Sequence, residues 1–295
     1  MKRQTGIISV AFALFLLWGA VGLFAQHTHE FSVSGGGGLS NFSYKASGVE
    51  QKSGAGGNFD FGYHYFFTPK WGLGTGAELA FYNANVNIDN FDLAYMAVDM
   101  EGASFEFRST VNAYEEKQSA LLLQIPLMLQ FQTGGAQKFY IAAGGKVGLP
   151  LNGKYNTTAS LRNSGYYARE NSLYDTQEFM GFGSFPDKKT DGDLEFRTAF
   201  LVSVESGVKW RLNDTVSLYA GAYLDYGLNN ILAERTVASL PALVEYNTAD
   251  PTAFAINSVI KSRDNLGGAG ATQTFVDKMT PRAAGVRIRL AFGKS

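Results

Sequence analysis

Few residues in this chain of 295 residues could carry enzyme chemistry, because it contains three histidines and no cysteine. Acyl-transfer enzymes need a nucleophile within hydrogen-bond reach of a base, and histidine is the commonest base. His64 is the only histidine inside a regularly alternating segment, and no serine lies at a triad-like spacing from any histidine. We therefore expect no catalytic residue, no metal site and no cofactor.

Charged residues instead recur within alternating segments, in the phase that also holds glycine, alanine and serine. Both signs are present in similar number, whereas an ion channel favours one sign along a continuous path. Buried charges persist where they are paired and hydrogen-bonded. We expect a salt-bridged network inside a narrow barrel, formed by Asp60, His64, Glu78, Lys146, Arg197, Glu205, Lys209, Asp225, Arg287 and Arg289. A narrow gated porin-like channel is the first alternative.

The elements that must position these charges have a period of two, which indicates β-strands. The pattern predicts strands over 31–42, 54–67, 70–86, 119–132, 138–151, 194–211, 216–228 and 282–292. Each is long enough to cross a membrane, since a tilted strand needs roughly 9 to 11 residues. The sequence therefore predicts an all-β fold, an eight-stranded antiparallel up-and-down transmembrane β-barrel. A further hairpin within 229–280 would make ten strands.

One of these strands contains the run LLLQIPLMLQF, residues 121–131. The run is too short for a membrane helix, and a proline in a helix interior removes a backbone hydrogen bond. As a strand, it places alternate Leu, Ile and Phe residues toward lipid and Pro126 toward the interior. Proline also leaves a gap in a strand ladder, so we expect a bulge or a compensating side chain beside it.

The connections alternate between short turns and longer loops, as they do in outer-membrane barrels. Turns follow the strands near 68–70, 133–137 and 212–215, whereas 88–118, 152–193 and 229–280 are long. The short turns are expected on the periplasmic side and the long loops outside the cell. An aromatic girdle is expected at the short-turn end, formed by Phe66, Phe67, Trp71, Phe131, Phe139 and Trp210.

The N-terminus and the composition agree with export to an outer membrane. Basic residues, an apolar run and small residues over 1–25 predict a signal peptide, which leaves 26–295 as the barrel. A formal net charge of -1 argues against nucleic-acid binding. In a soluble ligand-binding barrel the apolar residues would face inward and the alternate residues would face water. Those alternate residues are mostly glycine, alanine and serine, where a water-facing surface would carry lysine, glutamate and threonine. A soluble barrel and a lipid-modifying enzyme together form the second alternative.

The chain resembles the small outer-membrane β-barrel family, similar to the barrel domain of outer membrane protein A and to PorT-like barrels. The resemblance rests on the "FAQ" signal end, "LLLQIPLML", "AGAYLDYGLNNI" and the closing "GVRIRLAFG". It implies a location in the outer membrane of a Gram-negative bacterium, in contact with its lipid, and our interpretation of the whole sequence is a structural or surface-binding role. It also implies insertion by the barrel-assembly machinery through a C-terminal strand whose outward residues are Val286, Ile288, Leu290 and Phe292.

The loop 152–193 is rich in aromatic residues, more than a solvated loop needs. They form a possible contact surface for a surface protein or glycan: Tyr155, Tyr166, Tyr167, Tyr174, Phe179, Phe182 and Phe185. The preferred alternative is that these residues pack over the barrel mouth or prolong its strands.

Overall fold

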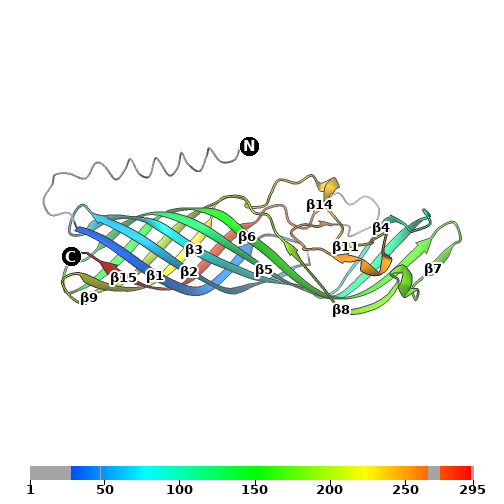
Figure 1. Cartoon of the computed structure of the whole chain (residues 1–295), viewed down its shortest axis with the longest axis horizontal. Coiled ribbons are helices and arrows are strands. Elements are labelled where there is room, and N and C mark those ends of the chain that lie inside the picture. The colour runs from blue at the N-terminus through cyan, green and yellow to red at the C-terminus, as the bar shows by residue number, and fades with distance from the viewer. Residues whose placement is uncertain (1–27, 47, 265–272, 294–295) are drawn as a thin grey trace.

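The computed structural model describes residues 28–46, 48–264 and 273–293, and shows an elongated β-structure (Figure 1). The expected signal peptide at 1–25 lies outside the described residues and stays a prediction. No helix within the described part of the chain is long and apolar enough to cross a membrane.

Eight long strands form a closed antiparallel ring. In chain order they are β1 (Thr28–Ser43), β2 (Glu50–Phe66), β3 (Trp71–Ile88), β5 (Ser104–Gln132), β6 (Gln137–Tyr167), β9 (Ala199–Arg211), β10 (Val216–Gly227) and β15 (Thr280–Phe292). Each strand pairs with the next in this order, and β1 pairs with β15 to close the ring. The eight-stranded barrel is confirmed. The ten-stranded alternative is wrong, because the described part of 229–280 adds no strand to the ring.

Two of the expected loops are largely strand. β5 begins at Ser104 and β6 ends at Tyr167, and the two strands stay paired as far as Glu106 and Tyr166. β4 (Phe91–Val98) pairs with β5, while β7 (Ser172–Tyr174) and β8 (Gly183–Asp193) pair with β6. Together these strands form a sheet that projects beyond the ring, toward the right of Figure 1. The expected boundaries at 119 and 151 are therefore wrong.

The described residues of 229–279, which we call the cap segment, pack against this projecting sheet. Its described part contains short elements only: η2 (Val237–Ser239), β11 (Val244–Glu245), η3 (Pro251–Ala253), β12 (Ala255–Ile256), β13 (Arg263–Asp264) and β14 (Gln273–Thr274). Its apolar side chains join those of the sheet in one buried cluster, which includes Phe105, Phe107, Val244 and Val259. The cap segment and the projecting sheet, with η1 (Glu178–Met180), form a folded unit that we call the head.

The outward side chains of the ring form an apolar band. Phe61, Leu127 and Phe139 are 60%, 63% and 66% exposed. The outward residues of the C-terminal strand also belong to it: Val286, Ile288, Leu290 and Phe292. The band ends where outward positions become polar, for example at Lys52, Lys117 and Lys154. Alternation of apolar outward and polar inward residues is what a lipid-facing barrel requires.

The aromatic residues expected at the short-turn end lie on the outer surface, with one exception. Phe67, Trp71 and Phe139 are exposed, and the Trp71 ring lies 5.0 Å from that of Phe131. Trp210 is half-buried on the outward phase of β9. Phe66 was misassigned: it is 2% exposed, because it continues the inward phase of β2.

Pro126 faces the barrel interior and interrupts the ladder between β3 and β5. The pairs flanking the gap are Thr75 with Leu127 and Glu78 with Gln124, and the register is the same on both sides. The hydroxyl of Thr75 donates a hydrogen bond of 2.8 Å to the Pro126 carbonyl. A side chain thus satisfies the Pro126 carbonyl beside the gap, and the pairing of β3 with β5 has no bulge at this site.

We predict that Val147→Arg destabilises the barrel while Asn156→Arg does not. Both residues are exposed on β6, but Val147 lies within the apolar band and Asn156 lies beyond it. An arginine near the middle of a membrane costs about 2–4 kcal/mol. Urea unfolding in lipid vesicles measures the difference. Equal midpoints for the two variants would show that the band does not face lipid.

Candidate functional site

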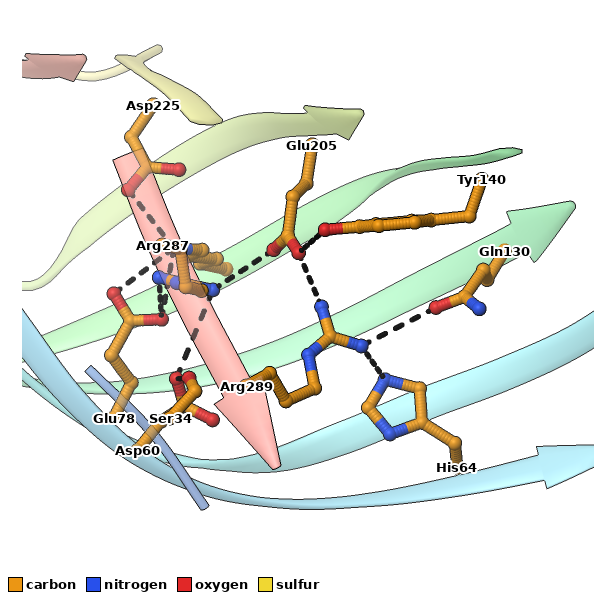
Figure 2. A network of polar contacts seen from close by, with 11 residues as sticks. Ser34, Asp60, His64, Glu78, Gln130, Tyr140, Glu205, Asp225, Arg287 and Arg289 are labelled. Carbon is orange, nitrogen blue, oxygen red and sulfur yellow. Dashed lines mark hydrogen bonds and ion pairs between the residues drawn. The ribbon is translucent and has the colours of Figure 1, made fainter. Parts of the chain in front are cut away.

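The inward phase of the ring carries a continuous network of charged side chains (Figure 2). Its acids come from β2, β3, β9 and β10, and its bases come from β6 and β15. An eight-stranded ring is only wide enough for side chains to fill it, so residues from opposite strands reach one another.

Arg287 on β15 lies at the centre of the network. Its guanidinium donates to Glu78 at 2.9 Å and to Glu205 at 3.2 Å, and lies 3.8 Å from Asp60. Asp60 also accepts a hydrogen bond from the Ser34 hydroxyl. One cation thus links carboxylates from three strands.

Lys146 on β6 joins two of the carboxylates. Its ammonium lies 3.1 Å from Glu78 and 2.9 Å from Asp225. The side chains of all three residues are no more than 2% exposed. Glu78 therefore bridges Lys146 and Arg287, which ties β3 to β6 and β15.

Arg289 organises the next layer toward the short turns. It pairs with Glu205, which also accepts a hydrogen bond of 2.6 Å from the Tyr140 hydroxyl. The Arg289 guanidinium lies 3.0 Å from His64 Nε2 and 3.4 Å from Gln130 Oε1. Since a guanidinium only donates, His64 Nε2 accepts, and the neutral imidazole carries its proton on Nδ1.

Lys209 does not reach this layer and forms a separate pair with Glu30 near the short turns. The Tyr219 hydroxyl donates to the same carboxylate at 2.6 Å, and the Lys209 ammonium lies 5.3 Å from the centre of the Phe66 ring. Sequence reasoning missed Glu30, although it precedes Ser32 and Ser34 in the inward phase of β1. The expected strand began at residue 31, three residues after the start of β1 at Thr28, and so excluded Glu30.

Arg197 was assigned to the network wrongly. It lies outside the ring strands, its side chain is 53% exposed, and it pairs with exposed Glu234 of the cap segment at 3.0 Å. The expected strand 194–211 began too early, because the alternation was extended N-terminally beyond the start of β9 at Ala199.

The network leaves little free space inside the ring. The cavity among these residues has a volume of about 30 Å³, which is room for about one water molecule. Small residues allow this packing: a Cβ atom at Gly74 would lie 2.6 Å from the His64 ring. At the level of the network, the interior of the ring is therefore packed with charged side chains.

A second buried charge lies beyond the apolar band, where the head meets the ring. Glu116 on β5 accepts hydrogen bonds from the Ser258 hydroxyl at 2.6 Å and the Val259 backbone N–H at 2.9 Å. The Tyr114 hydroxyl and the Gln118 amide also donate to it. Burial raises the pKa of the Glu116 carboxyl, although these hydrogen bonds oppose the shift. This cluster holds the cap segment against β5.

The aromatic residues expected to form a contact surface do not share one face. Tyr155, Tyr167 and Phe182 are 5%, 8% and 0% exposed, and Phe182 packs 5.5 Å from the Phe105 ring. Tyr155 and Phe182 are thus core residues and were wrongly included in a contact surface. Tyr155, Tyr166 and Tyr167 lie in β6, as the alternative of prolonged strands requires.

The other aromatic residues of this set are more accessible. Phe179 is 73% exposed. Tyr174 lies 5.3 Å from the Tyr167 ring, and Phe185 lies 4.8 Å from Phe254. Tyr166 faces outward beneath the Arg108 guanidinium. Only Phe179 is therefore fully available for contact.

We predict that Lys146→Met lowers the free energy of unfolding by about 3–5 kcal/mol, because Asp225 is left buried without its cation. The double variant Lys146→Met/Asp225→Asn should recover part of the loss. Lys52→Met, which breaks an exposed pair with Glu50, should cost about 0.5 kcal/mol or less. Denaturant titration in vesicles measures all three. A wild-type midpoint for Lys146→Met would contradict a stabilising network.

Comparison with known proteins agrees with this architecture. The profile of the family described as outer membrane protein beta-barrel domain matches residues 24–233. No curated protein matches the chain.

Among solved structures, the chain is similar to three small outer-membrane barrels. Neisserial surface protein A is 10% identical, with 90% of this chain and 99% of that chain covered and a TM-score of 0.33. OprG from Pseudomonas aeruginosa is 12% identical, with 90% and 94% covered and a TM-score of 0.34. Ail of Yersinia pestis is 10% identical, with 90% and 97% covered and a TM-score of 0.30. The family match covers most of the chain, and together with the closed ring it shows that this protein belongs to the outer membrane β-barrel domain family and lies in the bacterial outer membrane.

Proposed function

We propose that this protein is a closed barrel that anchors a folded binding head at the cell surface. The observation that carries the proposal is the filled interior: paired charges from opposite strands leave a cavity of only about 30 Å³. A hydrated ion needs a continuous path lined by suitable groups. A salt-bridged core of both signs supports an anchoring role over the alternative of a narrow gated channel.

The orientation of the head is part of the proposal. Outer-membrane barrels place their short turns in the periplasm and their long connections outside. The turns between β2 and β3, β5 and β6, and β9 and β10 are short, whereas the head grows from the opposite end of the ring (Figure 1). We therefore place the head outside the cell.

The far end of the head supports a role in binding. Large apolar side chains are exposed there without a neighbour covering them: Met96, Val98, Met100, Leu173 and Phe179. Clustered apolar exposure on a folded protein is typical of an interaction site. We propose that a surface protein or glycan, or a smaller ligand, binds at this end.

Two further partners belong to the proposal. The outward residues Val286, Ile288 and Leu290 on β15 would contact outer-membrane lipid. The same strand, which closes the ring against β1, would be the one that the barrel-assembly machinery engages during insertion.

The proposal assigns the protein no catalytic step. His64 Nε2 is taken by Arg289, and His29 Nδ1 lies 2.6 Å from the Tyr63 hydroxyl. Within the described residues no serine hydroxyl is hydrogen-bonded to either ring. Neither histidine is placed as the base of a nucleophile–base pair.

We predict that the wild-type protein gives no steady conductance in a planar lipid bilayer. The variant Arg287→Ser removes a cationic side chain that contacts three carboxylates and leaves space in its place. This variant should therefore show intermittent current. Steady open channels in the wild type, with ion selectivity altered by Lys146→Met, would establish the channel alternative instead.

We predict that a cysteine at Glu170 is labelled on intact cells by a membrane-impermeant maleimide, and that one at Ala136 is labelled only after the outer membrane is permeabilised. Both residues are exposed, at the head and at the β5–β6 turn respectively. The chain has no cysteine of its own, so each label reports one site. The reverse labelling pattern would place the head in the periplasm.

A further inference from the structure

The far end of the head contains a cavity that the barrel network does not account for. Its volume is about 420 Å³, within the usual range for small-molecule sites. Four separate stretches line it: the β4–β5 turn, the end of β6 with the following turn, β7 with η1, and the cap segment. The cavity therefore exists only when the head is folded.

Two tyrosines form walls that other rings hold in place. The Tyr167 ring stacks on Phe105, with centroids 5.0 Å apart and planes at 11°. The Tyr246 ring meets the same Phe105 edge-on at 5.1 Å. Tyr174 lies at 89° to Tyr167, and exposed Phe179 borders the opening. Fixed aromatic faces attract cations without losing side-chain freedom on binding.

Carboxylates surround the cavity without balancing cations. Asp99, Glu101 and Glu170 line it, and no lysine or arginine does. Within the described residues none of these three acids forms an ion pair. Arg108 pairs with Glu106 at 2.5 Å and Arg162 with Asp175 at 3.4 Å, while Arg169, next to Glu170 in the chain, is exposed and does not line the cavity.

The deepest of these acids is built into the wall. Asp99 is 8% exposed and accepts hydrogen bonds from the backbone N–H groups of Glu101 and Ala103. Its other carboxylate oxygen accepts a hydrogen bond of 2.9 Å from the Tyr167 hydroxyl. Burial and the adjacent Asp99 raise the pKa of Tyr167, so this hydroxyl remains a donor. The negative charge at the cavity wall is thus fixed in position.

One polar atom on the wall lacks a partner. Tyr246 is 8% exposed and lines the cavity, and within the described residues its hydroxyl makes no hydrogen bond. A buried hydroxyl without a partner costs free energy, which a ligand that hydrogen-bonds to it recovers. An N–H donor suits this position, because the surrounding carboxylates already favour a cation.

We propose that this cavity binds a small aliphatic polyamine. Its protonated amino groups would meet the carboxylates and the aromatic faces and donate to Tyr246, while its methylene chain would contact Met100, Met180 and Pro251. This assignment names a ligand class for the surface-binding role proposed above and rests on that role.

Calorimetric titration of the folded full chain in detergent tests the assignment, with spermidine and 1,5-diaminopentane as probes. We expect saturable binding of both amines, weakened by added salt because the rim carboxylates are screened. 1,5-Pentanediol, which has the same length without charge, should not bind. Absence of saturable binding by both amines would overturn the proposal.

Three variants test the contacts, each checked for folding by heat-modifiable gel migration. Tyr246→Phe should lower the amine affinity about tenfold, since a hydrogen bond to a charged group is lost. Glu170→Gln should lower it about threefold. Glu115→Gln, an exposed acid of β5 outside the cavity, should leave it unchanged.

Two competing probes give outcomes that exclude the polyamine. Saturation by Mg²⁺ alone, with amines unable to displace it, would make the site a metal site. Choline binding as tightly as spermidine, with no effect of Tyr246→Phe, would make it a cage for quaternary ammonium groups. Titration in detergent does not depend on orientation, so failed amine binding is distinguishable from failed surface labelling.

Discussion

Pairing of charges inside a narrow ring is the constraint on which the rest of this structure depends. A lipid-facing barrel has no water at its outer wall, and an eight-stranded ring leaves none to spare inside. Each buried ion must then find its counter-ion on another strand. Arg287, Arg289 and Lys146 do so through carboxylates of four other strands, so the side chains fix the relative positions of strands that the backbone ladder alone joins only to neighbours.

The head obeys different physics from the ring. Its core is apolar and faces inward between the projecting sheet and the cap segment, as in a water-soluble domain. Between the charge network and the cap segment lies Glu116, a buried carboxylate that is satisfied by hydrogen-bond donors instead of a cation. Strands β5 and β6 run through both the ring and the head, so the two parts share continuous, paired strands (Figure 1).

The sequence was sufficient to predict the ring, because a period of two over many residues leaves few alternatives. It also placed most of the interior charges, since phase decides the side of the strand. The prediction was wrong where the alternation does not show at which residue a strand begins or ends. Glu30 and Arg197 were misjudged because the strand limits were misplaced, and Phe66 because nearness to the turn outweighed its phase. The expected limits of β5 and β6 were too short, although prolongation of strands over 152–193 was the preferred alternative, because the alternation there is mixed with polar residues on the inward side.

The cavity at the far end lay beyond sequence reasoning for another reason. Its walls come from stretches far apart in the chain, and Asp99 and Tyr246 meet only through tertiary packing. No local spacing encodes that meeting. The aromatic residues of 152–193 gave a signal for this end of the molecule. Several of them, however, are buried and do not line the cavity.

The position of Arg287 and Arg289 on the final strand has a consequence for how the barrel is made. Until β15 docks between β10 and β1, Glu205 lacks both of its cations and Glu78 lacks one. Closure of the ring and neutralisation of its buried carboxylates therefore occur in the same step. A chain that stops short of its last strand is left with an open edge and an uncompensated acidic lumen, which makes completion of the polypeptide a condition for a stable product.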